Sequence, residues 1–197
     1  MHKTVASGKI IVDGWNIVAG TDYVLPWGRP SNTLDLDLGR MADVIAAKSN
    51  RPIRFDEIAV HLGVCDRQRH PQRYATEQAM IRRWQRDPRV STRIRPNHFD
   101  AATGTYTEKG VDTAIALDLC TSHASGRFDA VVLFTADADL LPALEQAYRA
   151  PGTVVQLARW KDQPSSLWLP GEKLWVFSLD EADLAQCSVP HTTWDIA

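Results

Sequence analysis

Short apolar segments alternate with helix-like stretches along almost the whole chain of 197 residues, and this alternation restricts the fold more than any other feature. The expected strands are Lys9–Val12, Ile58–Val64, Val90–Arg95, Asp129–Phe134, Thr153–Leu157 and Leu174–Phe177. The expected helices are Leu34–Ala47, Tyr74–Gln85, Val111–Thr121 and Leu140–Arg149, with polar loops at residues 21–33 and 98–110. Strands that alternate with helices favour a parallel sheet covered by helices on both faces. The chain is therefore expected to form an α/β domain.

Length and composition favour one soluble domain over residues 1–197, because no linker or repeat divides the chain. No apolar run approaches the roughly 20 residues that cross a bilayer, so no membrane partner is expected. The N-terminal segment lacks the features of a signal peptide, which favours a cytoplasmic location. Cys65, Cys120 and Cys187 are far apart and form no metal-ligand pattern. They are expected to be reduced and mostly buried.

The net charge of −2 says little about partners, but the charges are unevenly distributed. Residues 66–95 contain nine arginines and three acidic residues, a net charge of +6, so the remaining residues sum to −8. The arginines are Arg67, Arg69, Arg73, Arg82, Arg83, Arg86, Arg89, Arg93 and Arg95. This distribution predicts a basic face beside an acidic one. A solvated arginine-rich helix without a partner would give the same pattern.

Acidic residues follow two of the expected strands and open one of the expected helices. Asp13 closes the first strand, Asp137 and Asp139 follow the most apolar strand, and Asp112 begins the 111–121 helix. Ligands of open parallel sheets bind at the carboxyl ends of the strands, so these side chains are expected to converge. Carboxylates that converge repel one another unless a cation lies among them. Hard cations such as Mg²⁺ or Mn²⁺ prefer oxygen ligands, which predicts a divalent metal site.

Each of these residues also has an ordinary structural explanation. An aspartate after a strand often caps a helix or forms a turn, and Asp139 lies where a helix N-cap would be placed. Glu108 is expected at the surface. Asp118 follows Asp112 by six positions, so it should point away from the site.

Three motifs, in order, resemble those of the NYN (LabA-like) branch of the PIN-like nucleases. That family shows a strand ending in DGxN, a helix start KGVD, and a strand ending in SGDxDF followed closely by Pro. The corresponding segments here are Asp13-Gly14-Trp15-Asn16, Lys109-Gly110-Val111-Asp112, and Thr135-Ala136-Asp137-Ala138-Asp139-Leu140 with Pro142 behind it. The resemblance extends from residue 8 to about 180, whereas residues 160–197 carry little that matches.

The resemblance implies a PIN-like three-layer α/β/α sandwich with a mostly parallel central sheet, and a metal-dependent endonuclease that cuts RNA. By motif match, the metal ligands would be Asp13, Asp112, Asp137 and Asp139, and Asn16 would assist catalysis. Two positions depart from the family. Thr135-Ala136 replaces Ser-Gly, which adds a methyl group where the backbone would approach a phosphate, and Leu140 replaces an aromatic residue.

The residues expected to bind substrate are Lys109, Thr135, Trp15, Arg82, Arg83 and Arg86. Lys109 would stabilise a phosphate, although a solvated loop lysine is the commoner case. Trp15 would stack on a base, although packing in the core is an equal alternative. The three arginines face outward from the 74–85 helix and would follow the phosphate backbone.

Two other functions remain open from the sequence. A nucleotide-sugar glycosyltransferase would use Asp137-Ala138-Asp139 as a metal-binding DxD, but it leaves Asp13 and Asp112 without a role. A non-catalytic RNA-binding or interaction module would retain the acidic residues without cleavage. A P-loop NTPase is excluded because no GxxxxGK[ST] is present. The expected partner is RNA, and a homodimer or a regulatory protein partner is compatible with the sequence.

Overall fold

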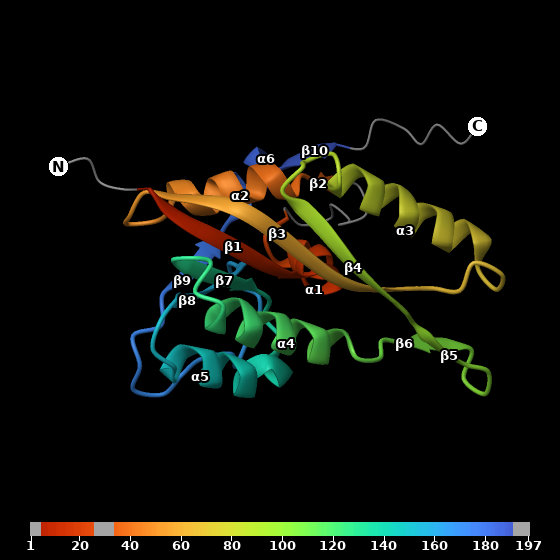
Figure 1. Ribbon diagram of the computed structural model, residues 1–197. Helices are drawn as coiled ribbons and strands as arrows, with labels where there is room; N and C mark the ends of the chain where they lie inside the picture. Colours follow the sequence, from red (N-terminus) through yellow and green to blue (C-terminus); the bar gives the residue numbers. More distant parts are fainter. Residues whose placement is uncertain (1–4, 26–33, 191–197) are drawn as a thin grey trace.

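A six-stranded parallel sheet forms the centre of the molecule (Figure 1). The computed structural model describes residues 5–25 and 34–190. In spatial order the strands are β4 (Val90–Pro96), β3 (Ile53–Val64), β1 (Ala6–Asp13), β7 (Ala130–Phe134), β8 (Val154–Trp160) and β9 (Val176–Leu179). The chain therefore proceeds from β1 to one edge of the sheet and then from β7 to the other. The topological switch point lies between β1 and β7.

Helices cover both faces of the sheet, which confirms the three-layer α/β/α architecture (Figure 1). One face carries α1 (Gly14–Gly20), α2 (Leu38–Ala47), α3 (Pro71–Trp84) and α6 (Glu181–Gln186), and the other carries α4 (Val111–Ala124) and α5 (Leu141–Arg149). Successive residues of a strand point to opposite faces. Ile10 and Val12 of β1 accordingly lie in the first core, and Ile11 lies in the second. The near-continuous apolar strands reflect this burial on both faces.

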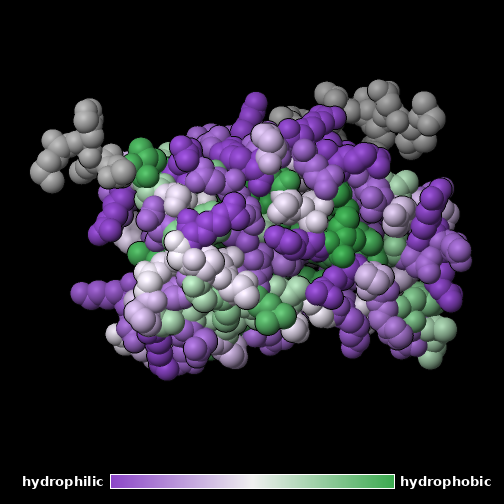
Figure 2. Space-filling view, viewed as in Figure 1, coloured by the Kyte–Doolittle hydropathy of each residue, from purple (hydrophilic) through white to green (hydrophobic). Residues whose placement is uncertain are grey.

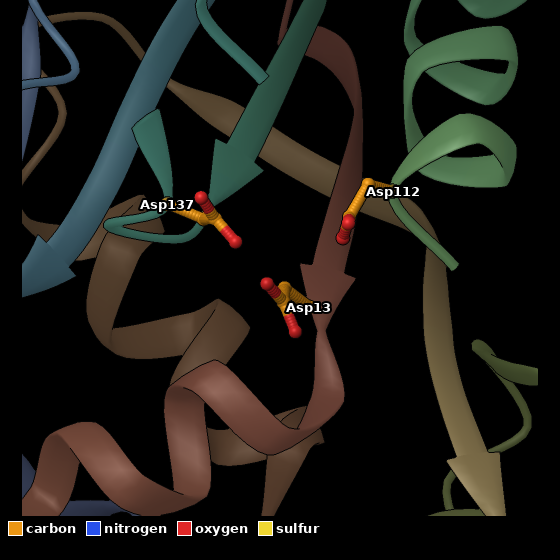
Figure 3. A group of neighbouring side chains, drawn as sticks. All are labelled: Asp13, Asp112 and Asp137. Atoms are coloured by element: carbon orange, nitrogen blue, oxygen red, sulfur yellow. The ribbon is translucent and has the colours of Figure 1, made fainter. Parts of the chain in front are cut away.

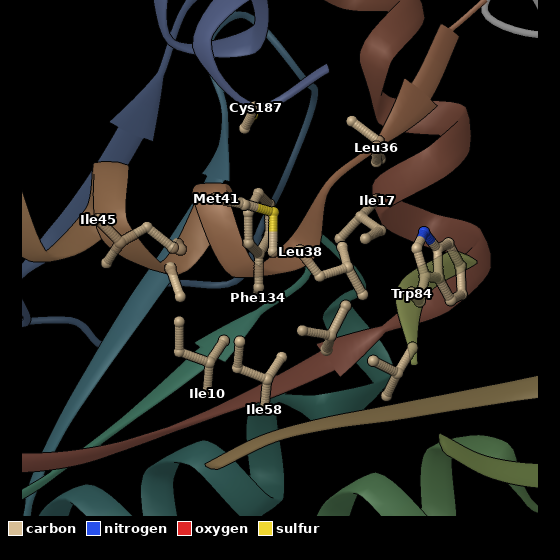
Figure 4. Close-up of a cluster of buried hydrophobic side chains, with 14 of the residues drawn as sticks. Ile10, Ile17, Leu36, Leu38, Met41, Ile45, Ile58, Trp84, Phe134 and Cys187 are labelled. Carbon is tan, nitrogen blue, oxygen red and sulfur yellow. The ribbon is translucent and has the colours of Figure 1, made fainter. Parts of the chain in front are cut away.

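The first core is built between the sheet and α2. Figure 4 shows Ile10 and Ile58 of the strands facing Met41 and Ile45 of α2. All four side chains are completely buried. The apolar positions of α2 recur at helical spacing, so burying this stripe is what holds the helix on the sheet.

The second core is completed by a segment without helix. The segment between β8 and β9, residues 161–175, contributes Leu167 and Leu169 to the cluster formed by α4 and α5. Leu157 of β8 and Val176 of β9 are still paired in parallel. Two buried leucines thus replace the crossover helix that usually covers such a connection.

Two predictions between residues 21 and 47 were wrong. The helix expected from Leu34 begins only at Leu38, because Asp37 caps it by accepting a hydrogen bond from the Arg40 backbone N–H at 3.0 Å. Leu34–Leu36 instead forms β2, which pairs antiparallel with β10 (Ser188–Pro190). Within the loop expected at 21–33, Thr21–Tyr23 forms a short 3₁₀ helix, and residues 26–33 lie outside the described residues.

The polar loop expected at residues 98–110 contains a β-hairpin. Its strands are β5 (His98–Asp100) and β6 (Thr105–Thr107), and Phe99 lies directly opposite Tyr106. A cross-strand aromatic pair stabilises such a hairpin, and Gly104 supplies the positive φ of 69° in the turn. The polar composition of this segment concealed the pair.

The cysteines are free thiols, and Cys65 and Cys187 are buried, as expected. Burial raises the pKa of Cys65 to about 11 and that of Cys187 to about 12, so both stay protonated at neutral pH. Among the described residues, no helix is long and apolar enough to cross a membrane.

Candidate metal centre

The topology brings the predicted aspartates to one edge of the sheet. Asp13 ends β1, and the neighbouring β7 ends one residue before Thr135, so both strands deliver their following residues to the switch point. Asp112 lies in the first turn of α4, which packs against β1 and β7. Figure 3 shows the three side chains of Asp13, Asp112 and Asp137 pointing toward a common space.

One carboxylate oxygen from each of Asp13, Asp112 and Asp137 lies within 4.8 Å of the other two. Asp13 is buried, with 6% of its surface exposed, whereas Asp137 is half-buried and Asp112 is exposed. The structure therefore assembles the three residues that the motifs single out as metal ligands. The site is closed on the Asp13 side and open to solvent on the Asp112 side.

Asp13 is held in place by two hydrogen bonds. No helix was expected directly after this residue, but the helix α1 begins at Gly14. Asp13 is its N-cap: Oδ1 accepts from the Asn16 backbone N–H at 3.2 Å, and Oδ2 accepts from the Thr135 hydroxyl at 3.0 Å. Trp15 and Asn16 thus belong to a helix, which fixes their directions.

Thr135 and Asn16 connect α1 to the loop after β7. The Thr135 hydroxyl, besides donating to Asp13, accepts from the Asp137 backbone N–H at 3.1 Å, and the residue is only 1% exposed. The Asn16 Oδ1 accepts from the Ala136 N–H at 3.0 Å and from Gln163 Nε2 at 3.1 Å. Thr135 therefore positions two carboxylate residues through a buried hydroxyl. No sequence motif pointed to Gln163.

The alanine that departs from the family pattern is accommodated in this loop. Ala136 is buried, and its carbonyl accepts from the Ser165 hydroxyl at 3.0 Å. Its N–H and C=O are thus both engaged by side chains from elsewhere in the chain, Asn16 and Ser165.

The three carboxylates are electrostatically costly without a cation. Burial raises the pKa of Asp13 to about 7, opposed by the hydrogen bonds from Asn16 and Thr135 and reinforced by the charges of Glu108 and Asp112. Burial, together with the charges of Asp137 and Asp139, also raises the pKa of Asp112. A divalent cation among the oxygens would remove this repulsion. The donor set, consisting of carboxylate oxygens, fits Mg²⁺ or Mn²⁺.

Asp139 and Glu108 lie beside the cluster without joining it. Asp139 is exposed, and its backbone N–H donates to Asp137 Oδ1 at 2.9 Å. Asp137, not Asp139, is therefore the cap of the short 3₁₀ helix Ala138–Leu140. Glu108 as a whole residue is exposed, as expected. Its carboxylate accepts from the Gly63 N–H at 2.6 Å, and partial desolvation of this carboxyl group raises its pKa. Lys109 is exposed, one residue after Glu108.

Asp118 points away from the site, as the helical spacing predicted. It accepts hydrogen bonds from Lys9 Nζ at 2.7 Å and His61 Nε2 at 2.9 Å. Burial opposes ionisation, but these bonds and the Lys9 charge lower the pKa of Asp118 well below its usual range. Lys9, which is 3% exposed, also pairs with Glu57 at 2.8 Å. The network joins β1, β3 and α4 under the site.

Several arginines of residues 66–95 lie at the two ends of α3. Arg82 and Arg86 are exposed near its C-terminal end, but Arg83 is half-buried and pairs with Asp35 of β2 at 2.6 Å. Arg69 and Arg73 lie at the other end, against the β5–β6 hairpin. The outward direction predicted for Arg83 is therefore wrong, because β2 supplies a carboxylate that draws it in.

A parallel sheet with carboxylates gathered at its switch point fits the PIN-like fold. Residues 9–168 match the family model of the NYN domain, and the chain belongs to this family. A crystal structure of a protein of unknown function from Vibrio parahaemolyticus has the same fold, with a TM-score of 0.58 and 13% sequence identity. The similarity covers 93% of this chain and 98% of that one. No curated protein matches the sequence.

Proposed function

We propose that this NYN-domain protein is a divalent-metal-dependent endoribonuclease that hydrolyses phosphodiester bonds of RNA. The observation that carries the proposal is the convergence of Asp13, Asp112 and Asp137 within 4.8 Å, in a member of the NYN domain family. Family membership supports nuclease chemistry, and the oxygen-only donor set supports Mg²⁺ or Mn²⁺. When bound, such a cation supplies charge relief for the phosphate and a more acidic water.

The buried and the exposed side chains of the site have different roles. Asp13, buried and held by Asn16 and Thr135, keeps one orientation and forms the fixed part of the metal site. Asp112 and Asp137 stand on the open side, where a phosphate can approach. Lys109, exposed three residues before Asp112, supplies a positive charge for that phosphate. This arrangement orients a phosphodiester without rearranging the buried half of the site.

The DxD alternative has less support from the geometry. A glycosyltransferase would need Asp137 and Asp139 to act together, yet Asp139 is exposed and outside the cluster of converging oxygens. A non-catalytic RNA-binding module has the same fold and differs in outcome: it binds RNA in the presence of Mn²⁺ and does not cut it.

The decisive experiment incubates labelled single-stranded RNA with the purified protein in Mg²⁺, in Mn²⁺ and in EDTA. We expect internal cleavage with metal and none in EDTA. Asp112→Asn keeps the shape of the side chain but removes its charge, so it should cut poorly. Asp139→Asn and Asp139→Ser are the matched controls at an exposed carboxylate beside the cluster, and both should cut nearly as well as wild type.

Melting curves separate a metal ligand from a structural residue. Wild type should gain about 2.7 kcal/mol of stability when Mn²⁺ is present at about 100 times its dissociation constant. Asp112→Asn should gain much less, and in EDTA it should melt at or above the wild-type temperature because repulsion is relieved. A variant that melts lower in EDTA and keeps the full Mn²⁺ response would contradict the assignment of Asp112.

A further inference from the structure

An open groove lies next to the metal centre. It has a volume of about 500 Å³, and its lining includes Trp15, His70, Arg73, Asn97, Tyr106 and Glu108. Trp15 follows Asp13 by two residues, and the charge of Glu108 contributes to the raised pKa of Asp13, so the groove and the metal centre adjoin. A ligand that occupies the groove therefore lies beside the carboxylate cluster.

Tyr106 and His70 line one side of the groove, and the ring of Phe99 lies beside that of Tyr106. We call these three rings, which meet at tilted or edge-to-face angles, the hairpin platform. The Phe99 and Tyr106 ring centroids lie 5.0 Å apart across the β5–β6 hairpin, and His70 lies 5.3 Å from Tyr106. Phe99 and Tyr106 are only half-buried, and His70 is exposed. Because the hairpin stands apart from both hydrophobic cores (Figure 1), these rings are not needed to close the main fold.

Arginines lie directly over this platform. The Arg69 guanidinium is 4.6 Å from the centroid of Phe99, and that of Arg73 is 5.6 Å from the centroid of Tyr106. Both side chains are exposed, although Arg73 also pairs with Glu77 at 2.8 Å. At this end of the molecule Figure 2 shows hydrophilic and hydrophobic surface intermixed. Aromatic rings and guanidinium planes are the two surfaces on which unstacked bases pack.

Both ends of the basic segment contain paired and exposed arginines. Arg83 is neutralised by Asp35, and Arg89 by Asp43 and Asp87, near α2. On the groove side, the Glu108 carboxylate is engaged by the Gly63 N–H at 2.6 Å. Arg69, exposed and beside the platform, supplies positive charge for phosphates at this rim.

We infer that the hairpin platform with Arg69 and Arg73 binds unpaired bases of a single-stranded RNA and leads its backbone to the carboxylate cluster. The inference rests on the proposed function in taking RNA as the substrate. A duplex does not fit the same surface, since its bases are stacked on one another and its grooves offer no base faces. Trp15 bounds the groove as a fixed wall, because its Nε1 donates to the Gly63 carbonyl at 2.7 Å.

The test measures binding of a fluorescent single-stranded oligoribonucleotide to the Asp112→Asn protein, which is expected to leave the RNA uncut. The variant Phe99→Leu/Tyr106→Leu keeps apolar bulk in the hairpin but removes both ring faces, and should weaken binding about 10-fold or more. Trp168→Leu, which removes an aromatic ring that is 60% exposed elsewhere on the surface, is the matched control and should bind like the parent. An unlabelled duplex of the same sequence should compete poorly.

A second variant keeps the test valid if Phe99→Leu/Tyr106→Leu does not fold. Arg69→Gln removes an exposed charge above Phe99, so it should weaken binding and reduce the salt dependence by about one phosphate contact. Unchanged affinity in both variants, or equal competition by the duplex, would overturn the inference. If the wild type cuts RNA but the platform variants bind it normally, the proposed function stands and the role of the platform is refuted. If the platform variants lose binding but the wild type does not cut RNA, the platform stands and the proposed nuclease function is refuted.

Discussion

Replacing Asp13 by asparagine should remove a pH dependence of stability from the metal-free protein. Burial raises the pKa of this carboxyl group to about 7 from a usual value of 3.8. A group whose pKa is raised by folding contributes stability that is complete below its unfolded pKa and is lost as the pH rises through its folded pKa. Wild type in EDTA should therefore become less stable from mildly acidic to mildly alkaline pH, and the variant should lack this loss.

The size of the effect follows from the two pKa values. Between about pH 5 and about pH 8, the Asp13 ionisation should cost wild type about 2–3 kcal/mol relative to the variant. For a domain of this size that corresponds to a difference of about 5–10 °C in melting temperature. The amide introduced by Asp13→Asn cannot be charged, but its oxygen can still accept the Asn16 N–H bond that Asp13 accepts. Local structure should therefore be kept.

The assay is a set of thermal melts in EDTA across this pH range, repeated with Mn²⁺. Wild type should recover its stability at alkaline pH when Mn²⁺ is added, because the cation favours the ionised carboxylate. Asp139→Asn is the control, since that carboxylate is exposed and outside the converging group, and its melts should follow wild type. If Asp13→Asn and wild type show the same pH slope in EDTA, the reasoning from the buried carboxylate is refuted.

Two further substitutions test how the site is supported. Asn16→Ala removes the oxygen that accepts from the Ala136 and Gln163 donors, so it should lower the free energy of unfolding by about 1–3 kcal/mol. It should also weaken Mn²⁺ binding in a calorimetric titration. An unchanged Mn²⁺ affinity would show that Asn16 has only a structural role. Lys9→Met removes the buried cation from Asp118 and Glu57 and leaves them the longer contacts to the exposed Arg93 and Arg127. Urea unfolding should show a loss of about 3 kcal/mol, and a loss below about 1 kcal/mol would contradict the importance of Lys9.

Local pattern was sufficient for the fold class and for the three converging aspartates. A strand buried on both faces is a continuous apolar run, so β1, β3 and β7 were visible without knowledge of their neighbours. Asp13 and Asp137 follow two such runs, and the carboxyl ends of adjacent parallel strands necessarily meet at one edge of the sheet. The separation of 122 residues between Asp13 and Thr135 is therefore bridged by topology alone.

Other features depend on contacts that no local pattern encodes. Gln163 reaches Asn16 across 147 residues, and Arg83 turns inward because β2 places Asp35 beside it. The platform exists because a polar-looking loop folds back so that Phe99 meets Tyr106 under Arg69 and Arg73 from α3 and its preceding turn. Periodicity determines which face of an element is apolar, whereas the partner of a polar side chain is decided only when the packed chain brings that partner within hydrogen-bonding distance.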